Sequence, residues 1–265
     1  MSGLRHYLLA VQFFTRIPVT GRLAQWVGYS PAMLRASAAH FPGVGVLVGA
    51  VVALFTLGLL QALPASAFAP LLAAALGTVL SVLITGGFHE DGLADVADGL
   101  GGSSQRERAL EIMKDSRVGA FGAMALVLAL LTKVALLALL GSVDTGLMVV
   151  ALFAAHVCSR TWPLLLIRLM PHVGDAAGSK SKPLADQISN ASLAVAGVWF
   201  AGAAALVGWL TTGVAWWAPL LASGLAWLWM ARLFWRRLQG FTGDCLGATQ
   251  QVCELAFYLG LALSL

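Results

Sequence analysis

The chain has 265 residues, of which 59% are hydrophobic and only 11% are charged, and its formal net charge is +4. Its mean hydropathy is +0.86. A water-soluble domain of this size would need far more polar surface, so the composition excludes that class and predicts an integral membrane protein. Membrane lipid is the expected surrounding medium, and no nucleic-acid partner is predicted.

The first segment of the chain is amphipathic. Apolar residues recur at helical spacing over residues 1–17, namely Leu4, Leu8, Val11 and Phe14. Arg5 and Arg16 stand at its flanks. This pattern predicts an N-terminal helix that lies at the membrane interface rather than crossing the membrane.

Seven longer apolar segments follow, and each approaches the roughly 20 residues that a spanning helix needs. We expect spans near 42–61, 66–86, 119–140, 146–169, 191–211, 214–235 and 246–265. No internal repeat and no low-complexity linker divides them. Residues 1–265 are therefore predicted to form a single all-α domain, a polytopic membrane helix bundle of about seven transmembrane helices.

Basic residues occupy every second connection between these segments. Lys or Arg occurs before the first span and after the second, fourth and sixth, whereas residues 61–65, 141–145 and 211–213 contain none. Cytoplasmic loops carry the excess of basic residues in membrane proteins. We therefore expect a multi-pass protein of the bacterial inner membrane with a cytoplasmic N-terminus, and the loop at about 87–118 should face the cytoplasm as the active-site loop.

That loop contains the most unusual segment of the chain. Residues His89 to Asp98 hold four carboxylates and a histidine, although no charged residue occurs between Arg35 and Glu90. If the segment is helical, Asp91, Asp95 and Asp98 share one face. Crowded carboxylates repel one another unless a cation lies between them. Oxygen ligands without a matching Cys/His set favour Mg²⁺ or Mn²⁺, and the role of His89 is open between hydrogen bonding and acid/base chemistry.

A cluster of both signs follows the acidic segment. Ser104–Glu107 matches a capping-box pattern and should start a short helix that runs toward Asp115. Lys114 and Arg117 beyond it either anchor the loop on the cytoplasmic side or bind phosphate. An arginine fork suits a bidentate phosphate contact, so we predict that Arg117 binds substrate phosphate rather than merely anchoring the loop.

Three further charged residues fall at membrane depth, namely Lys133, Arg160 and Glu254. Such residues face a protein interior or a cavity, and each is a functional-site hypothesis by default. A structural ion pair is the alternative for Lys133. Asp244 lies in a Gly-rich turn on the predicted cytoplasmic side, which by itself is a weak signal.

Together these blocks resemble the adenosylcobinamide-GDP ribazoletransferase family, also called cobalamin synthases. The resemblance extends over nearly the whole chain and is carried by Phe14–Pro18, Phe41–Gly45, Gly87–Gly99, Ile112–Gly119 and Thr242–Ala248, followed by Glu254. The chain departs from the family pattern in three places. Family members often have Leu where this chain has Glu90, often have Glu where it has Gln251, and often carry a Tyr-Ala-Arg sequence that is not evident at Leu169–His172.

The resemblance implies a late step of cobalamin biosynthesis. Adenosylcobinamide-GDP and α-ribazole, or its 5′-phosphate, would give adenosylcobalamin, or its 5′-phosphate, plus GMP, with Mg²⁺ as cofactor. It implies Asp91, Asp95 and Asp98 as metal ligands and catalytic residues, together with His89. It further implies phosphate contacts from Lys114, Arg117 and Arg16, and supporting acids at Asp115, Asp244, Glu254 and Glu90.

Two other functions fit the same features. The acidic segment is similar to that of CDP-alcohol phosphotransferases, which act on other lipid or nucleotide substrates. A cation transporter could instead use the three aspartates as an ion site, with Lys133 and Glu254 along a path. The number of metal ions, the choice between free and phosphorylated ribazole, and assembly into a homo-oligomer are left open.

Overall fold

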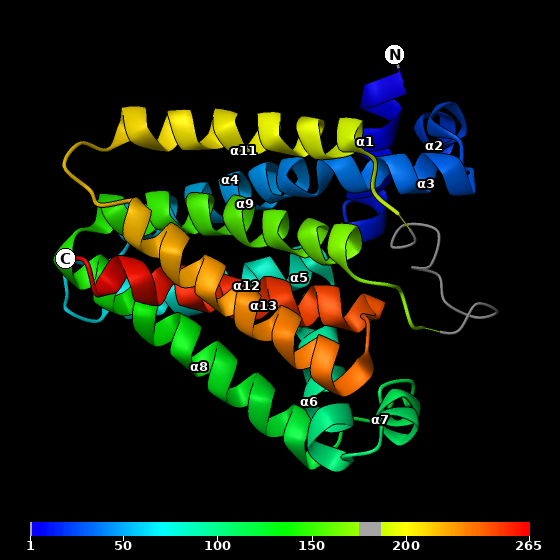
Figure 1. Ribbon diagram of the computed structural model, residues 1–265. Coiled ribbons are helices and arrows are strands. Elements are labelled where there is room, and N and C mark those ends of the chain that lie inside the picture. The colour runs from blue at the N-terminus through cyan, green and yellow to red at the C-terminus, as the bar shows by residue number, and fades with distance from the viewer. Residues whose placement is uncertain (1, 175–186) are drawn as a thin grey trace.

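A computed structural model describes residues 2–174 and 187–265. Within these residues the chain forms helices, with one isolated β-bridge between His172 and Phe241, so the predicted all-α class is confirmed. The helices labelled in Figure 1, with the short 3₁₀ helix η1, are α1 (Ser2–Phe14), α2 (Gly21–Val27), α3 (Pro31–Ser37), η1 (Ala38–His40), α4 (Phe41–Ala62), α5 (Ala69–Thr85), α6 (Phe88–Gly102), α7 (Arg106–Ile112), α8 (Ala120–Val143), α9 (Thr145–Leu169), α11 (Asn190–Leu210), α12 (Trp217–Leu238) and α13 (Gly243–Ala262).

Four helical segments are long and apolar enough to cross a membrane, namely Pro31–Ala62, α8, α9 and α11. A fifth crossing results if α5 and α6 are counted together as one bent span. The predicted count of seven is therefore not confirmed. Helices α12 and α13 occupy the expected sixth and seventh positions, but side chains such as Arg232 and Gln250 lower their hydropathy.

A sharp break separates α5 from α6. Gly86 and Gly87 both have positive φ, at +69° and +71°, and the two helix axes differ by 90°. Two consecutive left-handed residues favour glycine because a Cβ atom is disfavoured there. Beyond the break α6 carries four carboxylates, so we assign it to the polar edge of the bundle, outside the membrane-spanning segments.

The predicted short helix after α6 is present as α7. It begins at Arg106 after Gln105, which makes no side-chain hydrogen bond to the helix. The expected capping box at Ser104 is therefore not formed. Instead, the hydroxyl of Ser103 accepts a hydrogen bond from the backbone N–H of Gln105 at 3.1 Å.

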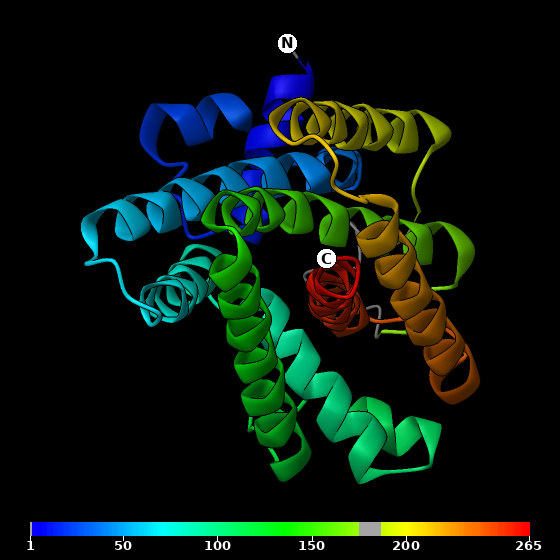
Figure 2. The same ribbon diagram turned by 90° about the vertical axis from the view of Figure 1, so that its left-hand side faces the viewer.

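Helix α13 lies at the centre of the bundle. In Figure 2 it is enclosed by α9, α12, α6 and α8, and it contacts all four. Most residues of α13 are buried, including Gln250, Gln251 and Glu254. The polar side chains of this helix are thus removed from both lipid and water and must find partners inside the bundle.

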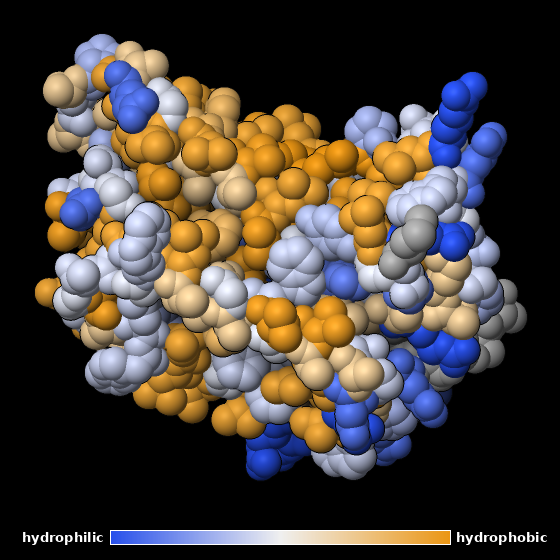
Figure 3. Space-filling view, turned by 90° about the horizontal axis from the view of Figure 1, so that it is seen from above, coloured by the Kyte–Doolittle hydropathy of each residue, from blue (hydrophilic) through white to orange (hydrophobic). Residues whose placement is uncertain are grey.

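Helix α1 runs crosswise to α4 and α11 in Figure 1. It buries Leu9, Val11 and Phe14 against the bundle, while Leu4 remains exposed. The position of this helix at a membrane interface stays a prediction. Figure 3 shows apolar residues over the middle of one face, whereas polar residues gather toward the right-hand end, the end at which α1 to α3 lie in Figure 1.

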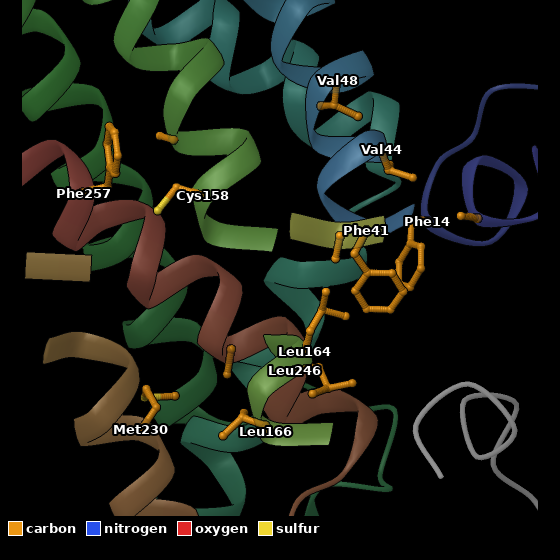
Figure 4. Packing of buried hydrophobic residues seen from close by; sticks show 14 of the residues in the cluster. Phe14, Phe41, Val44, Val48, Cys158, Leu164, Leu166, Met230, Leu246 and Phe257 are labelled. Atoms are coloured by element: carbon orange, nitrogen blue, oxygen red, sulfur yellow. The ribbon is translucent and has the colours of Figure 1, made fainter. Parts of the chain in front are cut away.

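Apolar side chains from several helices fill the interior, as Figure 4 shows for Phe14, Val44, Leu164, Met230 and Phe257. Helices α4 and α9 form the most extensive contact between two helices. Their close approach depends on small residues. A Cβ atom at Gly45 would collide with the carbonyl oxygen of His156 and lie 2.9 Å from Cα of Val157.

We therefore expect Gly45→Ala to destabilise the protein by about 1–3 kcal/mol, because the backbones of α4 and α9 must separate. Thermal inactivation of the detergent-purified protein measures the loss. Gly197→Ala on α11 is the matched control, because nothing lies within 4 Å of its added Cβ and alanine favours the helix. Equal inactivation temperatures for the two variants would contradict this packing argument.

Candidate active site

The predicted acidic segment forms helix α6, which packs against the first turn of α13. A Cβ atom at Gly92 would lie 2.7 Å from the carbonyl oxygen of Asp244, and one at Gly247 would lie 3.2 Å from the carbonyl oxygen of His89. Two glycines thus let the backbones of α6 and α13 approach closely. This crossing brings Asp244, a weak candidate in the sequence, beside the acids of α6.

The carboxylates at this crossing are electrostatically crowded. Burial, together with the charges of Asp244, Asp91 and Asp98, raises the pKa of Asp95 to about 7. Burial and the charge of Asp91 likewise raise the pKa of Asp244 to about 6, opposed by a 3.2 Å hydrogen bond that the Thr242 hydroxyl donates to its carboxylate. The arrangement is the expected one, in which repulsion favours either a proton or a bound cation.

Asp98 makes a different use of its carboxylate. Its Oδ2 accepts a hydrogen bond from the backbone N–H of Gly119 at 2.7 Å, and its Oδ1 accepts one from Gly122 at 2.8 Å. These donors belong to the N-terminus of α8, so Asp98 satisfies orphan amides and carries negative charge at the positive end of the helix dipole. Asp98 therefore joins α6 to α8.

The predicted three-aspartate metal site is not assembled as such. In residues 2–174 and 187–265, no group of three or more His, Cys, Asp or Glu side chains is placed to hold a metal ion. The physical reason lies in Asp98, whose two oxygens are turned to backbone amides. Asp91 is exposed and Asp95 is half-buried, so these two remain able to bind a ligand from outside.

A groove of about 710 Å³ runs beside α6 and is lined by α1, the α5–α6 break, α6 and α8. Arg16, Glu90 and Asp91 are its charged lining residues. The backbone N–H of Arg16 donates a 2.6 Å hydrogen bond to Ile84, and its side chain lies over Gly86, where a Cβ atom would collide with it. The groove thus presents a cation and carboxylates to the same ligand.

The other predicted phosphate contacts lie after α7. Arg117 forms a forked pair with Asp115, with Nε 2.9 Å from Oδ1 and Nη2 2.5 Å from Oδ2. These hydrogen bonds lower the pKa of Asp115 to about 2. The fork of Arg117 is thus already occupied by an internal carboxylate. Lys114 follows α7 and its backbone N–H donates to Glu111 at 3.1 Å.

Glu254 is the centre of a buried polar network. Its carboxylate pairs with Lys133 at 2.7 Å and accepts 2.9 Å hydrogen bonds from Tyr258 and Gln250. Lys133 and Glu254 are each only 1% exposed. The structural alternative for Lys133 is thereby confirmed, and these two side chains do not line an open ion path.

The network continues into α9. Arg160 Nη1 donates to the carbonyl oxygen of His156 at 3.1 Å and lies 2.9 Å from its Nδ1. Gln250 also donates to the hydroxyl of Ser159 at 2.9 Å. Charged and polar groups of α8, α9 and α13 therefore pair with one another inside the bundle, while Nε of Arg160 and Nε2 of His156 have no hydrogen-bond partner among the described residues.

His89 faces this network rather than the acidic groove. Its side chain is 5% exposed, and the charged groups that act on it are Arg160, Glu254 and Lys133. Burial and Arg160 hold the pKa of His89 well below its usual value, so the ring is neutral. This placement argues against an acid/base role for His89 in the acidic groove, and its Nδ1 has no hydrogen-bond partner among the described residues.

Comparison with known proteins agrees with the resemblance. Residues 6–262 match the family described as cobalamin-5-phosphate synthase. The chain belongs to this family. It is 70% identical to an adenosylcobinamide-GDP ribazoletransferase of Albidiferax ferrireducens, with 99% of each chain covered. It is 43% identical to one of Vibrio cholerae, covering 97% of this chain and 92% of that one. No solved structure matches the chain.

As a member of the cobalamin-5-phosphate synthase family, the protein is a transferase, and two of its departures from the family pattern now acquire a structural meaning. Gln251 on α13 donates a 3.0 Å hydrogen bond to Oε1 of Glu90 on α6. The two unusual residues are therefore in direct contact. The hydrogen bond between Gln251 and the Glu90 carboxylate links the buried network to the acidic helix α6.

Sequence reasoning missed several members of the network, namely Gln250, Gln251, Tyr258, His156 and Ser159. A signal was present in the chain. Gln250, Glu254 and Tyr258 follow one another at intervals of four residues, which places them on one face of a helix. A polar stripe of this kind in an apolar helix indicates internal partners.

The ion pair leads to a stability prediction. Glu254→Leu would leave the Lys133 ammonium buried without its partner, so we expect a loss of about 3–5 kcal/mol. The double variant Lys133→Met with Glu254→Leu should recover much of that loss, because no ammonium is then left buried without its carboxylate. Thermal unfolding in detergent measures both. If the double variant is as unstable as Glu254→Leu, the unpaired Lys133 ammonium is not the cause of the lost stability.

Proposed function

We propose that this protein transfers the adenosylcobinamide phosphate group from adenosylcobinamide-GDP to α-ribazole, or to its 5′-phosphate. GMP leaves, and adenosylcobalamin, or its 5′-phosphate, is formed. The names of the relatives support the donor and the ribazole acceptor. The single structural observation that carries the proposal is the groove in which Arg16 and Asp91 lie together, beside the crowded carboxylates of Asp95 and Asp244.

The proposal includes Mg²⁺ as cofactor. Mg²⁺ binds in proteins through one or two carboxylates plus substrate phosphates, so it does not require three converging aspartates. Asp91 and Asp95 fit as these ligands, and their repulsion with Asp244 would be relieved by a cation. When bound, Mg²⁺ would stabilise the charge that develops on the pyrophosphate oxygens.

The remaining residues of the site would bind substrate phosphate or hold the helices of the groove in place. Arg16, which lines the groove, would hold a substrate phosphate by charge-assisted hydrogen bonds. Asp98 keeps α8 against α6 and so shapes the groove wall that contains Leu126. Lys114 and Arg117 are further phosphate-binding candidates, and Arg117 would have to exchange Asp115 for a phosphate to act in that way.

GMP release by detergent-purified protein, given both substrates and Mg²⁺, tests this function. We expect Asp91→Asn to lose most turnover with little loss of thermal stability, because Asp91 is exposed and is proposed to bind Mg²⁺. Asp98→Asn should lower thermal stability by about 1 kcal/mol, the scale of a helix cap, and retain more turnover. No GMP release from the parent protein would reject the function. Full activity of Asp91→Asn would reject its role as a ligand.

We further propose that the groove faces the cytoplasm of a bacterial inner membrane, because the loops near it are basic. Cysteine labelling in a background without Cys158, Cys245 and Cys253 tests the orientation. Arg108→Cys on α7 should react only from the cytoplasm, and Ser142→Cys near the opposite end of α8 only from outside. Both positions are exposed. The reverse pattern would overturn the orientation.

A further inference from the structure

A second, smaller cavity lies deeper than the groove, where α1, α4, α6, α9 and α13 meet. Its volume is about 20 Å³, enough for one water molecule. Aromatic rings form one part of its wall and polar side chains form another. Figure 4 shows Phe14 and Phe41 side by side, with Val44 and Leu246, which also line the cavity, close to them.

Two residues in the polar part of the wall carry unsatisfied atoms. Nδ1 of His89 and Nε of Arg160 are buried and have no hydrogen-bond partner within the described parts of the chain. The two residues are only 5% and 4% exposed. Buried polar groups in native proteins are nearly always paired, so these two atoms call for a ligand or a water molecule.

The aromatic part is suited to a planar ring. Phe14 contacts Phe41 edge-on, with 4.2 Å between ring centroids, and lies nearly parallel to the ring of His89 at 6.4 Å. Phe88 meets Phe14 edge-on at 5.6 Å. Phe88 lines both this cavity and the groove, and it is 39% exposed. It is therefore the wall between the two spaces, with room on its outer side.

We propose that this cavity opens, by rotation of Phe88 toward the groove, into a binding site for a planar heteroaromatic base. The inference rests on the proposed function, because both substrates of that reaction carry such a base. The ring would stack on Phe14 and hydrogen-bond to Arg160 and His89, whose free atoms suit the nitrogen and oxygen atoms at the edge of a base. The base is either the guanine of the donor or that of α-ribazole.

Binding measured without turnover tests the site. Isothermal titration of the full-length protein in detergent gives separate dissociation constants for GMP and for α-ribazole. Val44→Phe fills the cavity, so we expect Kd for one of the two compounds to rise about tenfold or more, the scale of a lost base–aromatic stack. Val48→Phe is the matched control, because Val48 is equally buried one turn along α4 and does not line the cavity.

Val44→Phe could prevent folding, so a second pair of variants with smaller changes in volume tests the same site. Phe14→Leu removes the stacking ring but keeps an apolar side chain, and Phe234→Leu, buried on α12 away from the cavity, is its control. If Kd rises for GMP alone, the site binds the guanine of the donor. If Kd rises for α-ribazole alone, the site binds the base of the acceptor. The site is wrong if the folded variants bind both compounds with the parent's constants, or if the parent binds neither. A parent that binds a base here yet releases no GMP would support the site and reject the proposed reaction.

Discussion

The ion pair between Lys133 and Glu254 is the interaction on which the placement of the acidic site depends. A charged side chain inside a membrane protein is expensive unless it is paired, so the two residues hold α8 and α13 in one register. Tyr258 donates to the oxygen of Glu254 that pairs with Lys133, Gln250 donates to the other oxygen, and Gln251 extends the network to Glu90 on α6. The acidic helix is therefore anchored from inside the bundle.

Close backbone contact supplies the second constraint. Gly92 and Gly247 place no side chain at the point where the two backbones cross, so the start of α13 lies against the acids of α6. The outcome is a group of carboxylates that repel one another, which is a local cost to the fold. Proteins tolerate such conflicts mainly at functional sites, where a ligand relieves them. The crowding at Asp95 and Asp244 supports the proposal that this site binds a cation and phosphates.

The contact between Glu90 and Gln251 relates this chain to its family. Members often carry Leu at the first position and Glu at the second, whereas this chain carries Glu and Gln. The Gln251 amide nitrogen lies 3.0 Å from the Glu90 carboxylate, so the two departures meet at one contact between α6 and α13. This is a physical reason for two departures that look independent in the sequence.

The sequence by itself determined the membrane class, the all-α fold and the helical acidic segment, because these follow from composition and from periodicity within single helices. It also predicted Asp91, Asp95, Asp244 and Arg16 as site residues, and the structure brings Arg16 and Asp91 to one groove and Asp95 and Asp244 to one crossing.

Only the tertiary structure decided which partner each polar group takes. Asp98 caps α8, Arg117 pairs with Asp115, and His89 turns inward toward Arg160. Partners of this kind come from helices far apart in the chain, or from loop geometry, and a local pattern carries no information about them. The count of spans also stayed open, because α12 and α13 combine the length of a span with polar side chains that only neighbouring helices can satisfy.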